Sequence, residues 1–210
     1  MAVRIDELTV ADSPAPWSAL GFELDGDTCV CGELRIRLGA AAGKGLVGWS
    51  LRGAEATELD GLPTRCSERP PPSPQGEHPN GVTRLDHLVA ITPALDRTVT
   101  ALSAAGLDLR RIREEPTPAG APRQAFFRLG ATILEVVQEP PEAIERGGGA
   151  ERSAFFWGLA FLAPDLDATV AGLGERVSEA RAAVQPGRRI ATLRRSAGLA
   201  LPVALISPVA

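Results

Sequence analysis

Apolar and polar residues follow the most regular pattern between residues 82 and 138, where they predict a complete βαβββ unit. Leu85–Ile91 is a short apolar run ended by Thr92-Pro93, which predicts a strand. Leu95–Ala105 carries apolar residues at helical spacing and precedes Gly106, so a helix is expected there. Three further strands are predicted at Leu107–Arg113, Arg123–Leu129 and Ala131–Gln138, with Gly130 in the last turn.

The segment 152–210 repeats this unit. Residues 159–173 align with residues 88–102 without gaps, and 7 of the 15 positions are identical. After the repeated helix, strands are predicted at Glu179–Val184, Ile190–Arg194 and Leu201–Ser207. A repeat of this length indicates duplicated supersecondary units that bury one face against each other.

Residues 1–64 form a weaker, abbreviated copy of the unit. Ile5–Leu8 resembles Leu85–Leu88, Glu33–Leu38 predicts a strand, and Leu46–Arg52 predicts an extra strand. Pro14 and Pro16 confine any helix here to the residues that follow them. The chain is therefore expected to hold an N-terminal module (1–64), a central module (82–138) and a C-terminal module (152–210).

Two segments between the modules are predicted to lack regular structure. The linker 65–81 contains five prolines, which remove backbone donors and fix φ: Pro70, Pro71, Pro72, Pro74 and Pro79. The segment 139–151 contains Pro140, Pro141 and the run Gly147–Gly149, so it is expected to be a loop.

Composition narrows the class of protein. The chain has 210 residues, 44% of them hydrophobic, and a net charge of −4. This negative charge gives no indication of a basic surface that would bind nucleic acid. No apolar stretch reaches the roughly 18–20 residues that a membrane helix needs, and no basic leader precedes an apolar run. We therefore expect a cytoplasmic protein that binds neither nucleic acid nor membrane.

Three cysteines and one linker histidine are candidates for other chemistry. An odd cysteine count favours reduced thiols. Cys29-Val30-Cys31 is not a CxxC motif, and the two cysteines are interpreted as small apolar residues on one face of a strand, in preference to a redox or zinc site. His78 lies in the Pro-rich linker and is interpreted as a loop residue, with a ligand or lid contact as the alternative.

The central module resembles the vicinal oxygen chelate superfamily, which includes glyoxalase I, bleomycin-resistance proteins and extradiol dioxygenases. Leu85–Ile91 with Leu95–Val99 is similar to the opening strand and helix of that module, and Gln124–Gly130 with Ile133–Val137 to its last two strands. The resemblance implies an α+β fold of repeated βαβββ modules whose sheets curl into a half-open barrel. It also implies a homodimer, and a divalent metal held by a His of a first strand and a Glu of a last strand.

His87 and Glu135 stand at those two positions. Side chains alternate along a strand, so each of them lies in a row of apolar residues. An unpaired imidazole or carboxylate there would cost several kcal/mol by the usual order-of-magnitude estimate, so each needs a partner. A metal ion and a direct His87–Glu135 pair are both compatible with this pattern.

The other modules depart from the family pattern. In the C-terminal module Gly158 takes the position of His87, and the last strand has no acid. In the N-terminal module Glu7 matches His87 and Arg37 matches Glu135. A metal set of His87, Glu135 and Glu7 would suit Fe, Mn, Ni or Zn, whereas Arg37 favours a salt bridge or an anionic ligand.

Two functions follow from this resemblance. One is a divalent-metal-dependent lyase, isomerase or dioxygenase acting on a small organic molecule, with Glu135 as ligand or base. The other is a metal-free small-molecule binding protein of the bleomycin-resistance type. Phe127 and Trp157 are predicted to wall the ligand pocket in either case. The sequence does not decide whether the chain is an enzyme.

Overall fold

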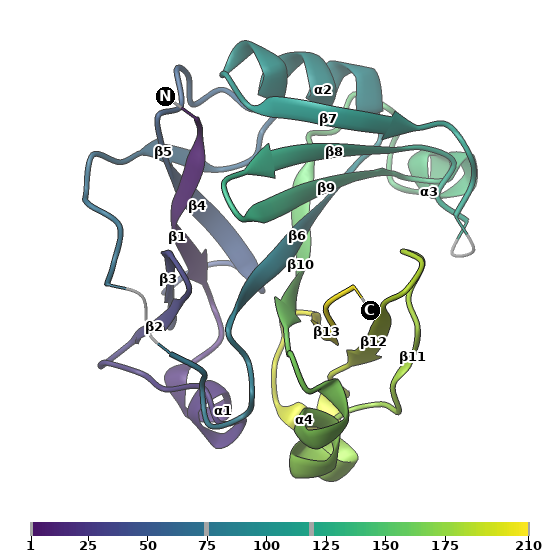
Figure 1. Cartoon of the computed structure of the whole chain (residues 1–210). Coiled ribbons are helices and arrows are strands. Elements are labelled where there is room, and N and C mark those ends of the chain that lie inside the picture. Colours follow the sequence, from purple (N-terminus) through teal and green to yellow (C-terminus); the bar gives the residue numbers. More distant parts are fainter. Residues whose placement is uncertain (1, 74–75, 118–119, 210) are drawn as a thin grey trace. The chain divides into compact units, whose positions relative to one another are not determined.

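The computed structural model of the chain describes residues 2–73, 76–117 and 120–209 (Figure 1). Pro74 of the predicted linker lies outside the described residues. The chain divides into two compact units: unit 1 comprises residues 1–5, 48–69 and 87–157, and unit 2 comprises residues 6–47, 70–86 and 158–210. The strands belong to two mixed sheets, one of five and one of eight strands. No helix among the described residues is long and apolar enough to span a membrane.

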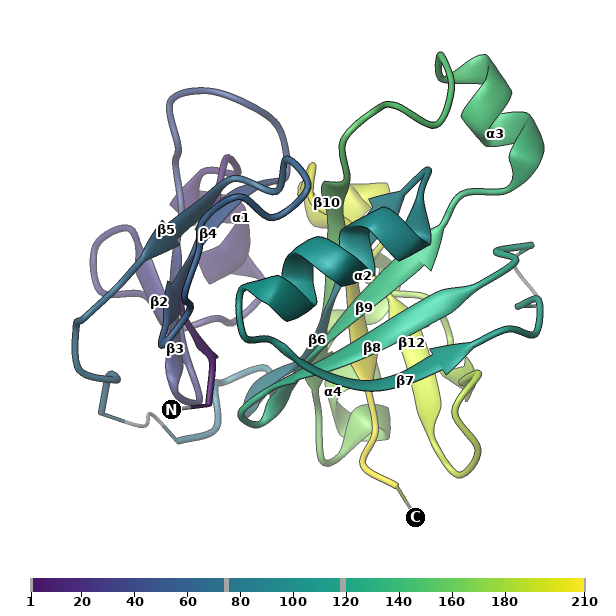
Figure 2. The ribbon, with the colours of Figure 1, turned by 90° about the horizontal axis from the view of Figure 1, so that it is seen from above.

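The central module forms the main part of unit 1, and its predicted elements are confirmed. They are β6 (Arg84–Thr92), α2 (Leu95–Ala104), β7 (Asp108–Arg113), β8 (Gln124–Leu129) and β9 (Thr132–Gln138). The strand order is β6-β9-β8-β7, with β6 parallel to β9 and the other neighbours antiparallel. Helix α2 lies over one face of these strands (Figures 1 and 2) and buries Leu95, Thr98 and Leu102.

Unit 1 also contains elements from outside the central module. Strand β4 (Leu46–Arg52) was predicted, but its parallel partner β5 (Thr64–Cys66) was not, because its three residues carry no apolar pattern. Helix α3 (Pro141–Arg146) corrects the loop predicted at 139–151. Proline suits the first turn of a helix, where its missing N–H would have no partner, and Glu142 and Arg146 complement the helix dipole.

Unit 2 combines residues 6–47 of the N-terminal module with residues 158–210 of the C-terminal module, and it includes residues 70–86. The first contributes β1 (Arg4–Val10), α1 (Pro14–Ala19), β2 (Thr28–Cys31) and β3 (Leu34–Arg37). The second contributes β10 (Phe155–Leu162), α4 (Leu166–Leu173), the short helices η1 (Gly174–Arg176) and η2 (Arg195–Ala197), and strands β11 (Arg181–Ala182), β12 (Arg189–Thr192) and β13 (Val203–Ile206). Their strand orders are β2-β3-β1 and β11-β12-β13-β10. The repeat is confirmed as structure, although β11 is much shorter than predicted.

The two modules of unit 2 are joined by buried contacts. Trp17 of α1 lies edge-on to Phe161 of β10 at 6.0 Å, and Phe22 lies 5.2 Å from the same ring. The Asp12 carboxylate accepts the backbone N–H groups of Ala200 at 3.0 Å and Leu201 at 3.2 Å. The core of unit 2 is therefore shared by chain segments almost 190 positions apart.

Two local features explain departures from the repeat. Helix α1 begins at Pro14 and includes Pro16, which corrects the expectation that a helix would start after both prolines. Proline is tolerated in a first turn because the N–H groups there have no helical partner. At Gly158 an added Cβ would lie 2.8 Å from the carbonyl oxygen of Pro202. The C-terminal module therefore has no room for a side chain at the position equivalent to His87.

Candidate functional site

The face of the unit 1 sheet opposite α2 is half-exposed and carries the two main candidate residues. Leu88 and Ala90 of β6 are buried toward the helix, whereas His87 and Val89 lie on the other face. The parallel register sets Val89 beside Glu135 of β9, so strand alternation places both candidates on the same face. This half-exposed face is called the sheet face below.

His87, Glu135 and Gln124 form a polar group on the sheet face. The Nε2 atom of His87 lies 4.0 Å from Oε2 of Glu135. The Gln124 side-chain amide donates a hydrogen bond to Oε1 of Glu135, while its own carbonyl oxygen Oε1 is buried and has no hydrogen-bond partner among the described residues. Burial raises the pKa of the Glu135 carboxyl, against the opposing effects of His87, Gln124 and Arg113.

Arginines of the edge strand β7 border this group. Arg113 pairs with Gln124 across the antiparallel ladder, and Arg111 pairs with Phe126. The Arg111 guanidinium lies 5.1 Å from the centroid of the Phe126 ring, in the geometry of a cation–π contact. The polar group therefore has an apolar and cationic edge.

Glu7 and Arg37 lie in unit 2, where they bind each other. The Arg37 Nε and Nη2 atoms donate to the two carboxylate oxygens of Glu7 at 3.3 and 3.2 Å. Nη1 of Arg37 lies 3.3 Å from Oδ1 of Asp27. Both charges of the N-terminal pair are thus neutralised within unit 2.

The two predicted pocket aromatics occupy very different surroundings. Phe127 pairs with Leu134 on the helix-facing side of the sheet and is fully buried, so it is a core residue of unit 1. The aromatic residue on the sheet face is its neighbour Phe126, which pairs with Glu135. Trp157 is 49% exposed.

A second cluster, formed by Cys29, Cys31 and His78, lies inside unit 2 and could hold a metal ion. The two cysteines point to the buried face of β2, as expected, and their sulfurs are 3.6 Å apart. Nε2 of His78 lies 3.3 Å from the Cys31 sulfur and 3.8 Å from the Cys29 sulfur. All three side chains are at most 3% exposed.

The His78 ring is held from both sides. Its Nδ1 accepts the backbone N–H of Glu23 at 3.1 Å, and the Phe22 ring lies 5.5 Å away. Without a metal, the Cys31 thiol lowers the pKa of Cys29 to about 6, opposed by burial and assisted by His78. Burial acts to lower the pKa of His78, but its neighbours, with Cys29 first, raise it overall.

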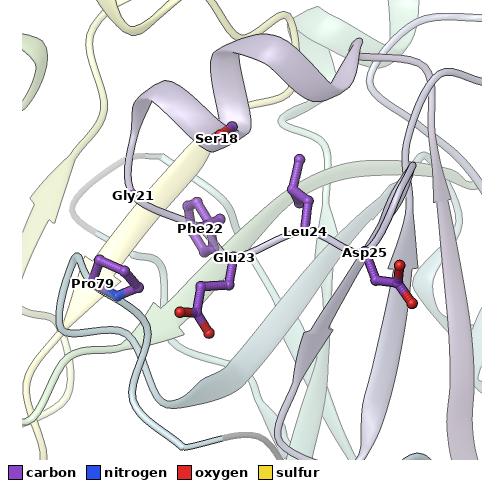
Figure 3. A pocket seen from close by; sticks show the side chains of 7 residues that line it. All are labelled: Ser18, Gly21, Phe22, Glu23, Leu24, Asp25 and Pro79. Atoms are coloured by element: carbon purple, nitrogen blue, oxygen red, sulfur yellow. The ribbon is translucent and has the colours of Figure 1, made fainter.

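A surface pocket of about 530 Å³ is formed in unit 2 by residues of α1, the loop after it and Pro79 (Figure 3); Cys29, Cys31 and His78 are not among its lining residues. Its lining includes Phe22, Glu23 and Asp25 of the loop after α1, and Pro79, which follows His78 in the chain. The two carboxylates are the only charged groups of the lining. The pocket therefore favours cations over anions.

Sequence reasoning singled out the two cysteines and His78 but did not bring them together. His78 lies 47 positions or more from either cysteine, in a linker without periodic pattern. The one available signal was the residue types themselves. The chain has only two histidines and three cysteines, and three of these five metal-binding side chains meet in the cluster.

Comparisons with known proteins support the fold. No protein-family model matches the chain, and no curated protein matches it in sequence. A solved xylose isomerase-like TIM barrel/4-hydroxyphenylpyruvate dioxygenase fusion protein is similar over 99% of this chain and 49% of its own, with 14% identity and a TM-score of 0.60. Methylmalonyl-CoA epimerases are also similar over part of the chain. The match to the Mycobacterium tuberculosis enzyme covers 62% of this chain and 91% of that enzyme, with 20% sequence identity and a TM-score of 0.49. The match to the Streptomyces coelicolor enzyme covers 61% of this chain and 99% of that enzyme, with 25% sequence identity and a TM-score of 0.48.

The fold class predicted from the sequence is confirmed by the two mixed sheets of βαβββ modules and by the match along the whole chain. The protein has the vicinal oxygen chelate fold. Because one fold hosts many chemistries, its activity has to be argued from the sites themselves.

Proposed function

We propose that the chain binds a small organic molecule on the sheet face of unit 1 and acts on it as a divalent-metal-dependent lyase, isomerase or dioxygenase. The observation that carries this proposal is the buried Gln124 Oε1, an acceptor without a partner among the described residues, beside Glu135 and His87. A buried acceptor of this kind costs about 1–3 kcal/mol unless a ligand or ion satisfies it.

The donor set fits a divalent cation. His87 offers an imidazole nitrogen, and Glu135 and Gln124 offer carboxylate and amide oxygens, which suit Mn, Fe, Ni or Zn. His87, Glu135 and Gln124 would hold the ion, which would supply Lewis-acid polarisation of a substrate oxygen when bound. Glu7 is a weaker candidate for this set, since Arg37 binds both of its carboxylate oxygens.

The chain's own residues would orient the substrate. Phe126 and Val89 offer apolar surface on the sheet face, and Arg111 and Arg113 offer guanidinium groups at its edge. This combination suits an organic acid with an apolar body, because a guanidinium binds a carboxylate through two parallel hydrogen bonds. In this proposal Glu135 accepts or returns a proton at the bound substrate.

The experiment is a Mn(II) titration followed by electron paramagnetic resonance of the free ion. Mn(II) is chosen because oxygen and nitrogen donors hold it and thiolates do not favour it. We expect one ion per chain, lost in Glu135→Ala, weakened in Gln124→Ala, and unchanged in the exposed control Glu115→Ala. Binding that survives Glu135→Ala would refute the site.

A metal-free binding protein is the second candidate, favoured by the Glu7–Arg37 pair and by the closed position at Gly158. Thermal-shift screening of aromatic and dicarbonyl acids without metal tests it. A ligand at 100 times its Kd should stabilise the fold by about 2.7 kcal/mol. Stabilisation that requires Mn(II) would refute the metal-free candidate.

A further inference from the structure

The buried cluster of unit 2 is independent of the sheet face and lies outside the function proposed above. We propose that Cys29, Cys31 and His78 form a binding site for a thiophilic divalent ion, with Zn(II) as the best match. Among the described residues this is the one group of three His, Cys, Asp or Glu side chains close enough together to hold a metal ion.

The spacing of the three donor atoms matches one face of a zinc tetrahedron. With Zn–S bonds of about 2.3 Å and Zn–N bonds of about 2.0–2.1 Å, tetrahedral geometry sets S···S at about 3.8 Å and S···N at about 3.5 Å. The cluster shows 3.6 Å between the sulfurs, and 3.3 and 3.8 Å from the sulfurs to His78 Nε2. A single ion can therefore reach all three atoms with displacements of a few tenths of an ångström.

Charge also favours a divalent ion. The three side chains are buried, and burial penalises any uncompensated charge. Two thiolates and one neutral imidazole around a 2+ ion make a site with no net charge. On binding, any proton that the two sulfurs still hold passes to solvent, and the sulfur lone pairs of Cys29 and Cys31 bind the ion.

His78 must rearrange its proton. In the neutral metal-free ring Nδ1 accepts the Glu23 N–H, so the ring proton sits on Nε2, facing the sulfurs. An ion bound at Nε2 moves that proton to Nδ1, which then needs an acceptor in place of the Glu23 N–H. Ligating histidines commonly donate this proton to a carboxylate, and the Glu23 side chain begins at the residue that now touches Nδ1.

One coordination position remains open beside the three side chains. Three protein ligands leave one tetrahedral position to water or a small ligand, as in catalytic zinc sites. The carboxylates of Glu23 and Asp25, shown in Figure 3, line a pocket together with Pro79, the residue after His78, and their charges attract cations to this part of the surface. The site therefore has three donors and carries no net charge once the ion is bound.

The test uses the full chain, purified without an affinity tag and kept reduced. We titrate it with Co(II) and measure its absorption spectrum, then displace Co(II) with Zn(II) and count bound metal by mass spectrometry. We expect one ion per chain, intense visible d–d bands of tetrahedral Co(II), and a sulfur-to-cobalt charge-transfer band. His87→Ala should keep this band, because the sheet face has no thiolate.

Variants test the ligands one by one. Cys29→Ser and Cys31→Ser should each lose most of the charge-transfer intensity, and the matched control Cys66→Ser, an exposed cysteine, should keep it. Glu23→Gln should weaken Zn(II) affinity by about 10-fold or more while leaving the spectrum tetrahedral.

The wild-type titration decides the matter even where a cysteine variant does not fold. Absence of bound metal, or Co(II) bound without a charge-transfer band, would overturn the proposal. Equal rates of Cys29–Cys31 disulfide formation by peroxide with and without Zn(II) would overturn it as well, because a thiolate bound to zinc is protected from oxidation.

Discussion

Asp12 offers a direct measure of how strongly the first and last modules of unit 2 hold each other. Asp12 is 8% exposed, and its carboxylate accepts two backbone N–H groups, from Ala200 and from Leu201. Asp12→Ala removes both acceptors without adding bulk. The remaining N–H groups then need water, which reaches the exposed Ala200 but not the buried Leu201.

The expected loss follows from these contacts. Hydrogen bonds to a charged group contribute about 1.5–3 kcal/mol each. Since water replaces the bond to Ala200 in part, we expect Asp12→Ala to lower the free energy of unfolding of unit 2 by about 2–4 kcal/mol. Asp12→Asn keeps one carbonyl acceptor and should lose about half as much.

The assay is urea unfolding followed by the fluorescence of Trp17 in a Trp49→Phe/Trp157→Phe background. Trp17 is the tryptophan of unit 2, because Trp49 and Trp157, the last residue of unit 1 before Gly158, both belong to unit 1; its fluorescence therefore reports on unit 2. The matched control is Asp25→Ala, at an exposed aspartate of the loop after α1, which should change stability by less than about 0.5 kcal/mol. A loss below about 1 kcal/mol for Asp12→Ala would show that the two modules are held together by other contacts.

Three further predictions concern packing and charge. Phe161→Ala should destabilise unit 2 by about 3–5 kcal/mol in urea unfolding, because it empties the aromatic core; a loss under 1 kcal/mol would contradict this. Gly158→Ala should lower the melting temperature, since its Cβ would meet the Pro202 carbonyl oxygen at 2.8 Å; an unchanged melting temperature would show that the strand shifts freely. Arg123 lowers the pKa of Glu114 through hydrogen bonds, so the pair stabilises the fold above the unfolded carboxyl's pKa and stops doing so as pH falls through the folded value. Arg123→Gln should raise the pKa of Glu114 in an NMR titration, and an unmoved titration would refute the pairing.

The central module was predictable because its strands and helix are long enough to show their periods. Alternation along β6 and β9 suffices to place His87 and Glu135 on one face, since parallel neighbours keep their faces aligned. The same rule on β8 separates Phe126 from Phe127, so the pairing of Phe126 with Glu135 follows once the strand register is known.

The cluster of Cys29, Cys31 and His78 in unit 2 could not be predicted in this way. The strand pattern predicts that Cys29 and Cys31 share a buried face. It does not predict which residues of the irregular linker 65–81 pack against that face, because the path of such a segment depends on tertiary packing. His78 is carried to the cysteines by a Pro-rich segment whose course no local pattern sets. Helix α3 was missed for a related reason, because paired prolines indicate a break as readily as the first turn of a helix.

The chain passes between its two units five times. On a ribosome, unit 1 has received its last segment once residue 157 has been made, whereas the N-terminal part of unit 2 still waits for residues 158–210. Asp12 meets Ala200 and Leu201 only at the end of translation. Strands β1 to β3 therefore spend most of synthesis without the C-terminal module that completes their core, a period in which chaperones would have most to protect. For the same reason, no single cut in the backbone can release either unit as one continuous fragment.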